Sequence, residues 1–169
     1  YSSHISHSKI RKYAKNNETL LVVLDQTPFY AESGGQVGDV GIMKGSSGEL
    51  KVLDVKKDNE THIHFCSGEL ENMEERLECM VDNQHRNSVK NNHTATHLMH
   101  KALKEVLGDH VNQAGSLVHP DYLRFDLTHF EKISQDEIIS IEKMVNQQIL
   151  LNTKVDVTVQ GFDEAKDAG

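Results

Sequence analysis

The sequence contains no tryptophan and only two cysteines, Cys66 and Cys79, which are far from any Cys-x-x-Cys spacing. This scarcity argues against a disulfide framework and against a cysteine-based zinc ribbon. The sequence also lacks a signal peptide and an apolar run of transmembrane length. We therefore expect a cytoplasmic protein with no membrane partner.

Basic residues are outnumbered by acidic ones. The 18 Lys and Arg residues against 26 Asp and Glu residues give a formal net charge of −8. That balance argues against a protein that coats nucleic acid by charge alone, although it is compatible with a local basic patch. The 169 residues suffice for one large domain or two small ones. Because the chain begins without Met and stops inside an expected helix at Gly169, we interpret it as part of a longer protein.

No phosphate-binding motif is present in the glycine-rich loop at residues 27–41, Thr-Pro-Phe-Tyr-Ala-Glu-Ser-Gly-Gly-Gln-Val-Gly-Asp-Val-Gly. The loop is not G-x-G-x-x-G, it lacks Gly-Lys-Ser/Thr, and no helix is predicted directly after it. Nucleotide binding is therefore not predicted here. Its glycines fit tight turns that require positive φ, and the polar residues among them also fit a functional loop.

The first half of the chain has the pattern of a small β-barrel. Strands are predicted at residues 8–14, 19–24, 49–55, 61–65 and 76–81, separated by turn residues at 16–17, 45–48, 58–59 and 67–68. Several short strands at such spacing are typical of this architecture. We therefore predict a barrel domain at residues 1–82.

The second half mixes helices and strands. A helix is predicted to run from residues 82–83 to Leu107, where Gly108 ends it. Ser134 and Glu137 match the capping box of another helix. Strands are predicted at residues 111–118 and 122–127 around a turn at 119–121, with a strand at 153–159 and a helix start at Asp163. The predicted fold class is α+β, with an α+β domain at residues 83–169.

Three histidines, His93, His97 and His100, fall on one side of the predicted long helix, with apolar residues roughly opposite. Histidines four apart can bind one divalent metal, with ring nitrogens about 2.0–2.1 Å from it. The alternative is an ordinary solvated helix face. The Glu of H-E-x-x-H is absent, and two imidazoles do not complete a site. His100 is a possible third ligand by geometry, and His85 is a poorer one.

Three stretches taken together resemble the editing region of alanyl-tRNA synthetases and their stand-alone editing relatives. They are residues 24–39 (Leu-Asp-Gln-Thr-Pro-Phe-Tyr-Ala-Glu-Ser-Gly-Gly-Gln-Val-Gly-Asp), residues 93–100 (His-Thr-Ala-Thr-His-Leu-Met-His), and residues 113–118 (Gln-Ala-Gly-Ser-Leu-Val) with Arg124-Phe125-Asp126. The resemblance covers nearly the whole chain. It implies a small N-terminal β-barrel followed by an α+β domain of the threonyl/alanyl-tRNA synthetase second additional domain type, with the site in the cleft between them.

The resemblance also implies an aminoacyl-tRNA deacylase. The expected reaction hydrolyses the ester of mischarged Ser-tRNA(Ala) or Gly-tRNA(Ala), and the expected partners are the acceptor end of tRNA(Ala) and the rest of an alanyl-tRNA synthetase. A pocket for alanine cannot strongly reject glycine and excludes an added hydroxyl only weakly, so a second, hydrolytic sieve is needed. Lys90, Lys101, Lys104 and Arg124 are candidate phosphate contacts, with solvated surface charge as the alternative.

The site residues follow from the same resemblance. Zinc ligands are expected at His93 and His97, catalytic roles at Gln113, Thr96 and Gln36, and substrate contacts at Gly34, Gly35, Glu32 and Arg124. In the family, zinc is completed by a Cys-x-x-x-His pair in a Cys-Gly-Gly-Thr-His segment, which this sequence does not contain. We therefore expect an incomplete zinc site and a fragment that is inactive or weakly active alone.

Other functions fit the same residues. The chain can be a non-catalytic module that docks the tRNA acceptor end, or a stand-alone trans-editing protein. A third alternative is a small-molecule metallohydrolase that uses the histidine pair alone.

Overall fold

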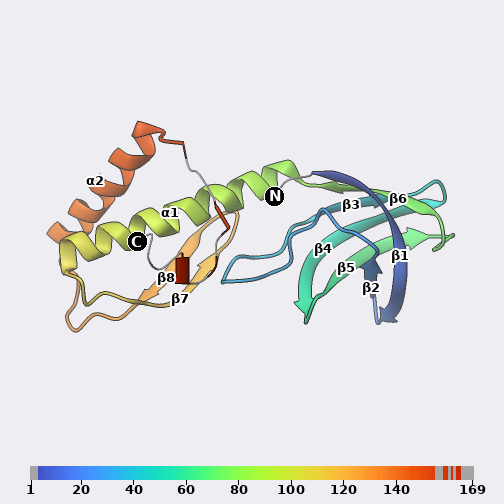
Figure 1. The fold of residues 1–169 in the computed structure, drawn as a ribbon, viewed down its shortest axis with the longest axis horizontal. Coiled ribbons are helices and arrows are strands. Elements are labelled where there is room, and N and C mark those ends of the chain that lie inside the picture. Colours follow the sequence, from blue (N-terminus) through green and yellow to red (C-terminus); the bar gives the residue numbers. More distant parts are fainter. Residues whose placement is uncertain (1–3, 155–157, 160, 162, 165–169) are drawn as a thin grey trace.

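The computed structural model describes residues 4–154, 158–159, 161 and 163–164. Its first part is a closed barrel with the strand order β1-β2-β5-β4-β3-β6 (Figure 1). The strands are β1 (Ile5–Asn16), β2 (Thr19–Leu24), β3 (Gly41–Lys44), β4 (Gly48–Asp58), β5 (Thr61–Leu70) and β6 (Arg76–Val81). The predicted barrel is thus confirmed, and the predicted bounds of β2 and β6 match the observed ones.

The barrel core is made of the inward residues of these strands. Val22, Met43, Leu50, Val52 and Leu77 are fully buried, as the period-two alternation of half-buried strands requires. The free thiols of Cys66 and Cys79 are buried in the same core, and burial raises the pKa of the Cys66 thiol to about 12. Both cysteines are therefore packing residues, in agreement with the absence of a disulfide framework.

β1, β4 and β5 extend beyond their predicted bounds, and two further details of the barrel differ from the prediction. β3 was not predicted, because its four residues directly follow the glycine-rich loop and show no alternation. Ser67-Gly68 was predicted to be a turn but lies inside β5, opposite β4. Gly68 has φ +110°, and a Cβ there would clash with the carbonyl oxygen of Glu49. The glycine permits close approach of two strands rather than a reversal of the chain.

The long helix α1 (Asn83–Leu107) begins directly after β6 and extends away from the barrel (Figure 1). The side chain of Asp82 caps it by accepting a hydrogen bond from the backbone N–H of His85. Gly108, at φ +111°, ends it and donates its N–H to the carbonyl of Lys104. Both ends of the helix are therefore determined by the local sequence.

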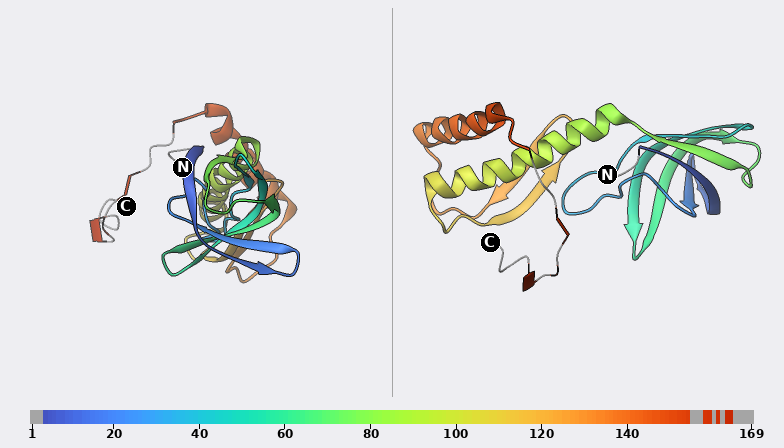
Figure 2. Two further views of the ribbon diagram at one scale, coloured as in Figure 1. Left: turned by 90° about the vertical axis from the view of Figure 1, so that its right-hand side faces the viewer. Right: turned by 45° about the horizontal axis from the view of Figure 1, so that its top comes forward.

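The second part of the molecule is built around the C-terminal half of α1. A hairpin of β7 (Gln113–Val118) and β8 (Leu123–Leu127) lies on one side of α1, and α2 (Gln135–Leu151) lies on the other (Figures 1 and 2). The predicted Ser134–Glu137 capping box is present at the start of α2. A second apolar core joins these elements through Ala102, Leu103, Val111 and Ile141.

Some predictions fall outside the described residues. The strand predicted at 153–159 includes residues 155–157, and the helix predicted from Asp163 continues into 165–169, none of which is described. No helix in the described part of the chain combines the length and apolar character needed to cross a membrane.

Candidate functional site

The glycine-rich loop leaves the barrel and lies along the start of the β7–β8 turn (Figure 1). The backbone N–H of Val118 donates to the carbonyl of Gly35 at 2.7 Å, and the N–H of Val37 donates to the carbonyl of Val118 at 3.1 Å. Gln36 and Val118 thus form a parallel bridge. The loop of the barrel part is therefore an added edge on the sheet of the α+β part.

This docking places Gln36 against α1. The side chain of Gln36 is buried, with 1% of its surface exposed, and its Oε1 lies 2.6 Å from Nδ1 of His93. An amide oxygen can only accept, so Nδ1 of His93 carries the proton and Nε2 is left with a free lone pair. Metal-binding and catalytic histidines are commonly oriented by an acceptor on the other ring nitrogen. Gln36 supplies such an acceptor here.

His97 lies one turn further along α1, with its ring stacked on that of His93 at a centroid distance of 5.1 Å and an angle of 23°. The pKa of His93 is lowered, mainly because the ring is partly buried and secondarily because of the neighbouring His97. His97 itself is exposed. The lowered pKa of His93 favours its neutral imidazole at neutral pH, the form that binds metals.

The third histidine of the predicted face does not join this pair. The ring of His100 packs on Phe125 of β8, with centroids 5.1 Å apart. Its Nε2 is buried without a hydrogen-bond partner. Within the described residues, no group of three or more His, Cys, Asp or Glu side chains is placed to hold a metal. The helical pattern suggested that the three histidines share one exposed face of α1. In the structure, this face is partly packed against the β7–β8 hairpin.

Gly35 brings the loop into close contact with Ser116 of β7. A Cβ on residue 35 would clash with the backbone carbonyl of Ser116 and lie 2.7 Å from its Oγ, and φ is +82°. The same Ser116 hydroxyl accepts a hydrogen bond from Nε2 of Gln113 at 3.0 Å. Gln113 is exposed at the open end of this cluster. Gly35, Ser116 and Gln113 therefore form a continuous polar edge beside Gln36 and His93.

The remaining predicted site residues lie at different depths. Thr96 is buried, and its hydroxyl donates to the carbonyl of Asn92 at 2.8 Å. Gly34 is exposed at φ +60° with no neighbour in contact range of a Cβ. Glu32 forms an exposed ion pair with Lys56 at 3.5 Å. Arg124 pairs with Asp126 on its own strand at 3.0 Å. Their predicted functional roles stay predictions.

A buried ion pair, which the sequence did not suggest, holds the loop on α1. Arg86 and Asp39 are both almost fully buried, and the guanidinium contacts the carboxylate through both Nη2 and Nε. Nη2 of Arg86 also donates to the carbonyl of Pro28 at 2.6 Å, and Asp39 accepts the N–H of Tyr30. Since a buried charge is costly unless it is paired and hydrogen-bonded, this network specifies one position for the loop.

A second contact fixes the β7–β8 turn on α1. The amide of Asn92 donates to the carbonyls of His119 and Pro120 at 2.7 and 3.1 Å. Asn92 directly precedes His93, so the same turn of the helix holds the hairpin and presents the imidazole. Asn92 was not singled out from sequence, because an amide on a helix gives no signal of its partner.

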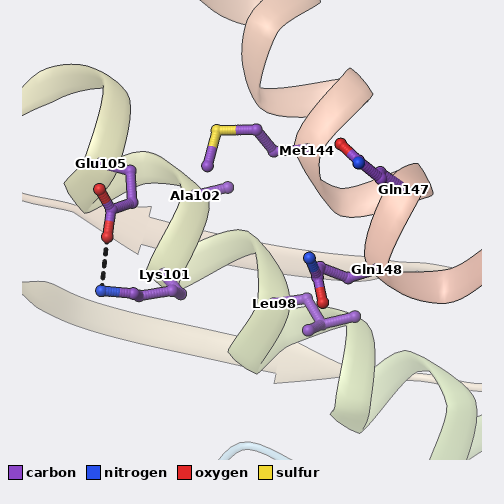
Figure 3. A pocket seen from close by; sticks show the side chains of 7 residues that line it. All are labelled: Leu98, Lys101, Ala102, Glu105, Met144, Gln147 and Gln148. Atoms are coloured by element: carbon purple, nitrogen blue, oxygen red, sulfur yellow. Dashed lines mark ion pairs between the residues drawn. The ribbon is translucent and has the colours of Figure 1, made fainter. Parts of the chain in front are cut away.

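A groove between α1 and α2 is not part of this cluster. It has a volume of about 390 Å³ and lies between α1 and α2, lined by Leu98, Ala102, Met144 and polar side chains at its rim (Figure 3). Leu98 and Ala102 come from the apolar side of α1, and Met144 comes from α2. The candidate site therefore lies on the opposite side, where the barrel loop, α1 and β7 meet.

Comparison with known proteins supports the resemblance seen in the sequence. Residues 3–86 match the family model described as tRNA synthetases class II (A). The chain is 46% identical to the alanine–tRNA ligase of Acetivibrio thermocellus, over 98% of this chain and 19% of that protein. It is 48% identical to the enzyme of Geobacillus thermodenitrificans, over 90% of this chain and 18% of that protein.

The chain is also 43% identical to the alanine–tRNA ligase of Clostridioides difficile, over 98% of this chain and 19% of that protein. The chain thus spans about a fifth of the length of each of these relatives. The chain is therefore homologous to a segment of alanine–tRNA ligases and belongs, through residues 3–86, to the class II tRNA synthetase (A) family.

Proposed function

We propose that this chain is the editing module of an alanyl-tRNA synthetase, which hydrolyses the ester of mischarged Ser-tRNA(Ala) or Gly-tRNA(Ala). The observation that carries the proposal is the hydrogen bond between Gln36 of the barrel loop and His93 of α1. It joins residues from both halves of the chain into one polar cluster. A hydrolytic site needs groups held in fixed positions, and burial of Gln36 gives that rigidity.

In this proposal, His93 and Gln36 act as a unit. Because Gln36 holds the proton on Nδ1, Nε2 of His93 faces the reaction with a lone pair. That nitrogen can accept a hydrogen bond from the attacking water or bind a metal that contacts the substrate. The lowered pKa of His93 keeps this lone pair available at neutral pH.

In this proposal, Gln113 contacts the amino acid or the ester. Its amide is exposed, and its Nε2 hydrogen-bonds Ser116 Oγ, which restricts its rotamers. Gly35 packs against the same serine, so the barrel loop sets the position of Ser116. A serine or glycine ester at this edge would lie between an amide that recognises polar groups and a loop that closes the site. The water-activating base stays unassigned and includes a hydroxyl of the terminal adenosine.

Zinc fits the two imidazoles only in part. Two histidines, one of them oriented through its second nitrogen, are half of a four-coordinate site. The described residues supply no further His, Cys, Asp or Glu to the cluster. Zinc bound by His93 and His97 would add a positive charge next to the ester carbonyl, and no step assigned here to the chain's own residues depends on it.

The test is a deacylation assay with purified Ser-tRNA(Ala), Gly-tRNA(Ala) and Ala-tRNA(Ala). The chain is expected to release serine and glycine faster than alanine, both alone and, at a higher rate, within a longer ligase that contains a Cys-Gly-Gly-Thr-His segment. Equal release of all three amino acids would contradict an editing role. Binding of tRNA without hydrolysis in either protein would favour the docking module, and hydrolysis of simple esters without RNA would favour a metallohydrolase.

A further inference from the structure

β1 carries several exposed cations, and none of them takes part in an ion pair in the part of the chain that the structure describes. Within β1, Lys9, Arg11, Lys12 and Lys15 are exposed, and the strand contains no Asp or Glu. A bulge between Ile10 and Lys12 keeps Lys9 and Lys12 on the outer side, while Ile10 packs on the core. This concentration of positive charge is unexpected in a chain whose formal net charge is −8.

The register of the barrel adds a fifth cation. Lys9 of β1 is directly opposite Arg76 of β6, so their side chains project from the same face. Like charges directly opposite each other in an antiparallel pair are unfavourable. In the part of the chain that the structure describes, neither residue takes part in an ion pair. The fold therefore tolerates a repulsive pair on this surface.

Several cations elsewhere in the molecule are paired with acids. Lys101 is paired with Glu105 at 2.6 Å, Arg124 with Asp126 at 3.0 Å, and Lys57 with Glu60 at 3.1 Å. These pairs include two of the residues that the sequence suggested as phosphate contacts. Lys104 of α1, another of those candidates, also forms no ion pair among the described residues, whereas β1 gathers several such cations on one strand.

The acidic groups nearest to this face are already engaged. The carboxylate of Asp25 accepts the backbone N–H groups of Lys9 and Gln26 at 2.8 and 2.9 Å. These bonds and the charge of Arg11 hold the pKa of Asp25 below its usual value. Glu78 is opposite His7 on β1 and Lys44 on β3. Asp25 lies opposite Lys9 in the continued β1–β2 register, but its carboxylate is bound by backbone N–H groups, and Glu78 lies opposite His7 and not opposite Arg76.

We propose that Lys9, Arg11, Lys12 and Arg76 form a seat for the phosphate backbone of duplex RNA. Outward residues two apart on a strand are spaced by about 6.7 Å, so the row presents its charges repeatedly along one direction, as a phosphodiester backbone does. The seat has no pocket or base-reading groups, and it therefore binds backbone independently of sequence. The inference rests on the proposed function for its RNA: the acceptor stem, whose 3′ end enters the Gln36–His93 cluster.

The test uses a blunt RNA hairpin that has neither a single-stranded 3′ tail nor an amino acid. Its affinity for the whole chain is measured by fluorescence anisotropy across a salt series, for the wild type and for Lys9→Gln, Arg76→Gln and the double variant. Each substitution is expected to weaken binding about 3- to 10-fold and to reduce the slope of log K against log[salt] by about 0.9. The matched control is Lys44→Gln, a lysine of the same barrel that lies opposite Glu49 and Glu78.

Thermal unfolding gives a second readout with a predicted sign. Loss of one charge from the Lys9–Arg76 pair removes a repulsion, so Lys9→Gln is expected to raise the melting temperature by about 1–3 °C while weakening RNA binding. Lys44→Gln removes an attraction and is expected to lower or preserve the melting temperature, with RNA affinity within twofold of wild type. If these cations are only a solvated surface, the melting temperatures should change in the same directions, but RNA affinity should not change.

Two results would overturn the proposal. One is hairpin binding that is unaffected by Lys9→Gln and Arg76→Gln. The other is that these substitutions weaken the binding of the chain to anionic phospholipid vesicles, measured in place of RNA. Because the hairpin carries no ester and no 3′ tail, either result leaves the deacylation assay unaffected. Conversely, a chain that binds the hairpin through these residues but hydrolyses no ester would disprove the proposed function and not the RNA seat.

Discussion

Gly35 lies against Ser116 so closely that a side chain on residue 35 would collide with the serine's backbone carbonyl. This contact, formed between the barrel loop and β7, predicts a specific effect of Gly35→Ala. The variant must shift the loop away from β7, in addition to straining a residue at φ +82°. We expect Ser-tRNA(Ala) deacylation to fall about 100-fold, the effect of a misplacement of about 1 Å.

The control is Gly34→Ala, which has a similar positive φ of +60° but no neighbour within contact range of the added Cβ. It should carry the strain alone, with a cost of about 1 kcal/mol and little loss of activity. Equal activity of the two variants would mean that the loop–β7 contact is not needed.

The Arg86–Asp39 pair predicts a large stability effect. Arg86→Met leaves the buried Asp39 carboxylate without its cation, although the N–H of Tyr30 still donates to it. We expect a loss of about 3 kcal/mol in the free energy of unfolding. In Arg86→Met/Asp39→Asn, the loss should be smaller than the sum of the single losses, because no unpaired charge is left. Urea unfolding measures each value, and a loss below about 1 kcal/mol for Arg86→Met would argue that the pair is not buried in solution.

His64 predicts a pH dependence of stability. It is buried between β2 and β5 as a neutral ring, with Nδ1 donating to the carbonyl of Val22 and Nε2 accepting from Thr27. Burial lowers the pKa of His64 to about 4. The unfolded chain, with a pKa near 6.5, therefore binds a proton first as the pH falls. Stability is complete above pH 6.5 and decreases between pH 6.5 and 4, by on the order of 3 kcal/mol in total.

Unfolding free energies of wild type and His64→Gln over this pH range isolate the contribution of His64 from that of the other histidines. The difference between the two proteins should shrink as the pH falls from 6.5 to 4. A difference that is constant over this range would show that His64 is not held neutral.

The histidine pair predicts weak zinc binding by this chain. Titration with zinc, followed by isothermal calorimetry, should show one site that is lost in His97→Ala and in His93→Ala. His100→Leu should leave binding intact, because the ring of His100 packs on Phe125 and leucine can fill that contact. Zinc binding that requires His100, or that persists without His97, would contradict the assignment of the pair.

Much of the fold could be predicted from local signals. The bounds of β2, β6 and α1 follow from turn residues, a capping Asp and a terminal Gly that act within a few residues of each element. Ser67-Gly68 misled the prediction because a glycine that permits close strand approach and a glycine that permits a turn are identical in sequence. Distinguishing them requires knowledge of the neighbouring strand.

The site was predicted only as a set of separate motifs. That Gln36 meets His93 depends on a backbone bridge between Gln36 and Val118, and backbone pairing carries no residue signature. Arg86 was not singled out, because an arginine on a helix normally predicts an exposed position, and here it pairs with an aspartate 47 residues away. The resemblance identified Gln36 and His93 as candidate residues, and the structure shows the contact between them.

The central claim is that Gln36 orients His93 for hydrolysis, and it is tested most directly by the Ser-tRNA(Ala) deacylation rate of Gln36→Met. Methionine is close to glutamine in volume, but its thioether sulfur is only a weak acceptor for the hydrogen bond from Nδ1. Gln26→Met is the matched control, since Gln26 is an exposed glutamine directly before the loop, and it donates to the carbonyl of His7. We predict about a 100-fold lower rate for Gln36→Met and a wild-type rate for Gln26→Met, with both proteins folded. A folded Gln36→Met protein that deacylates Ser-tRNA(Ala) at the wild-type rate would contradict the account.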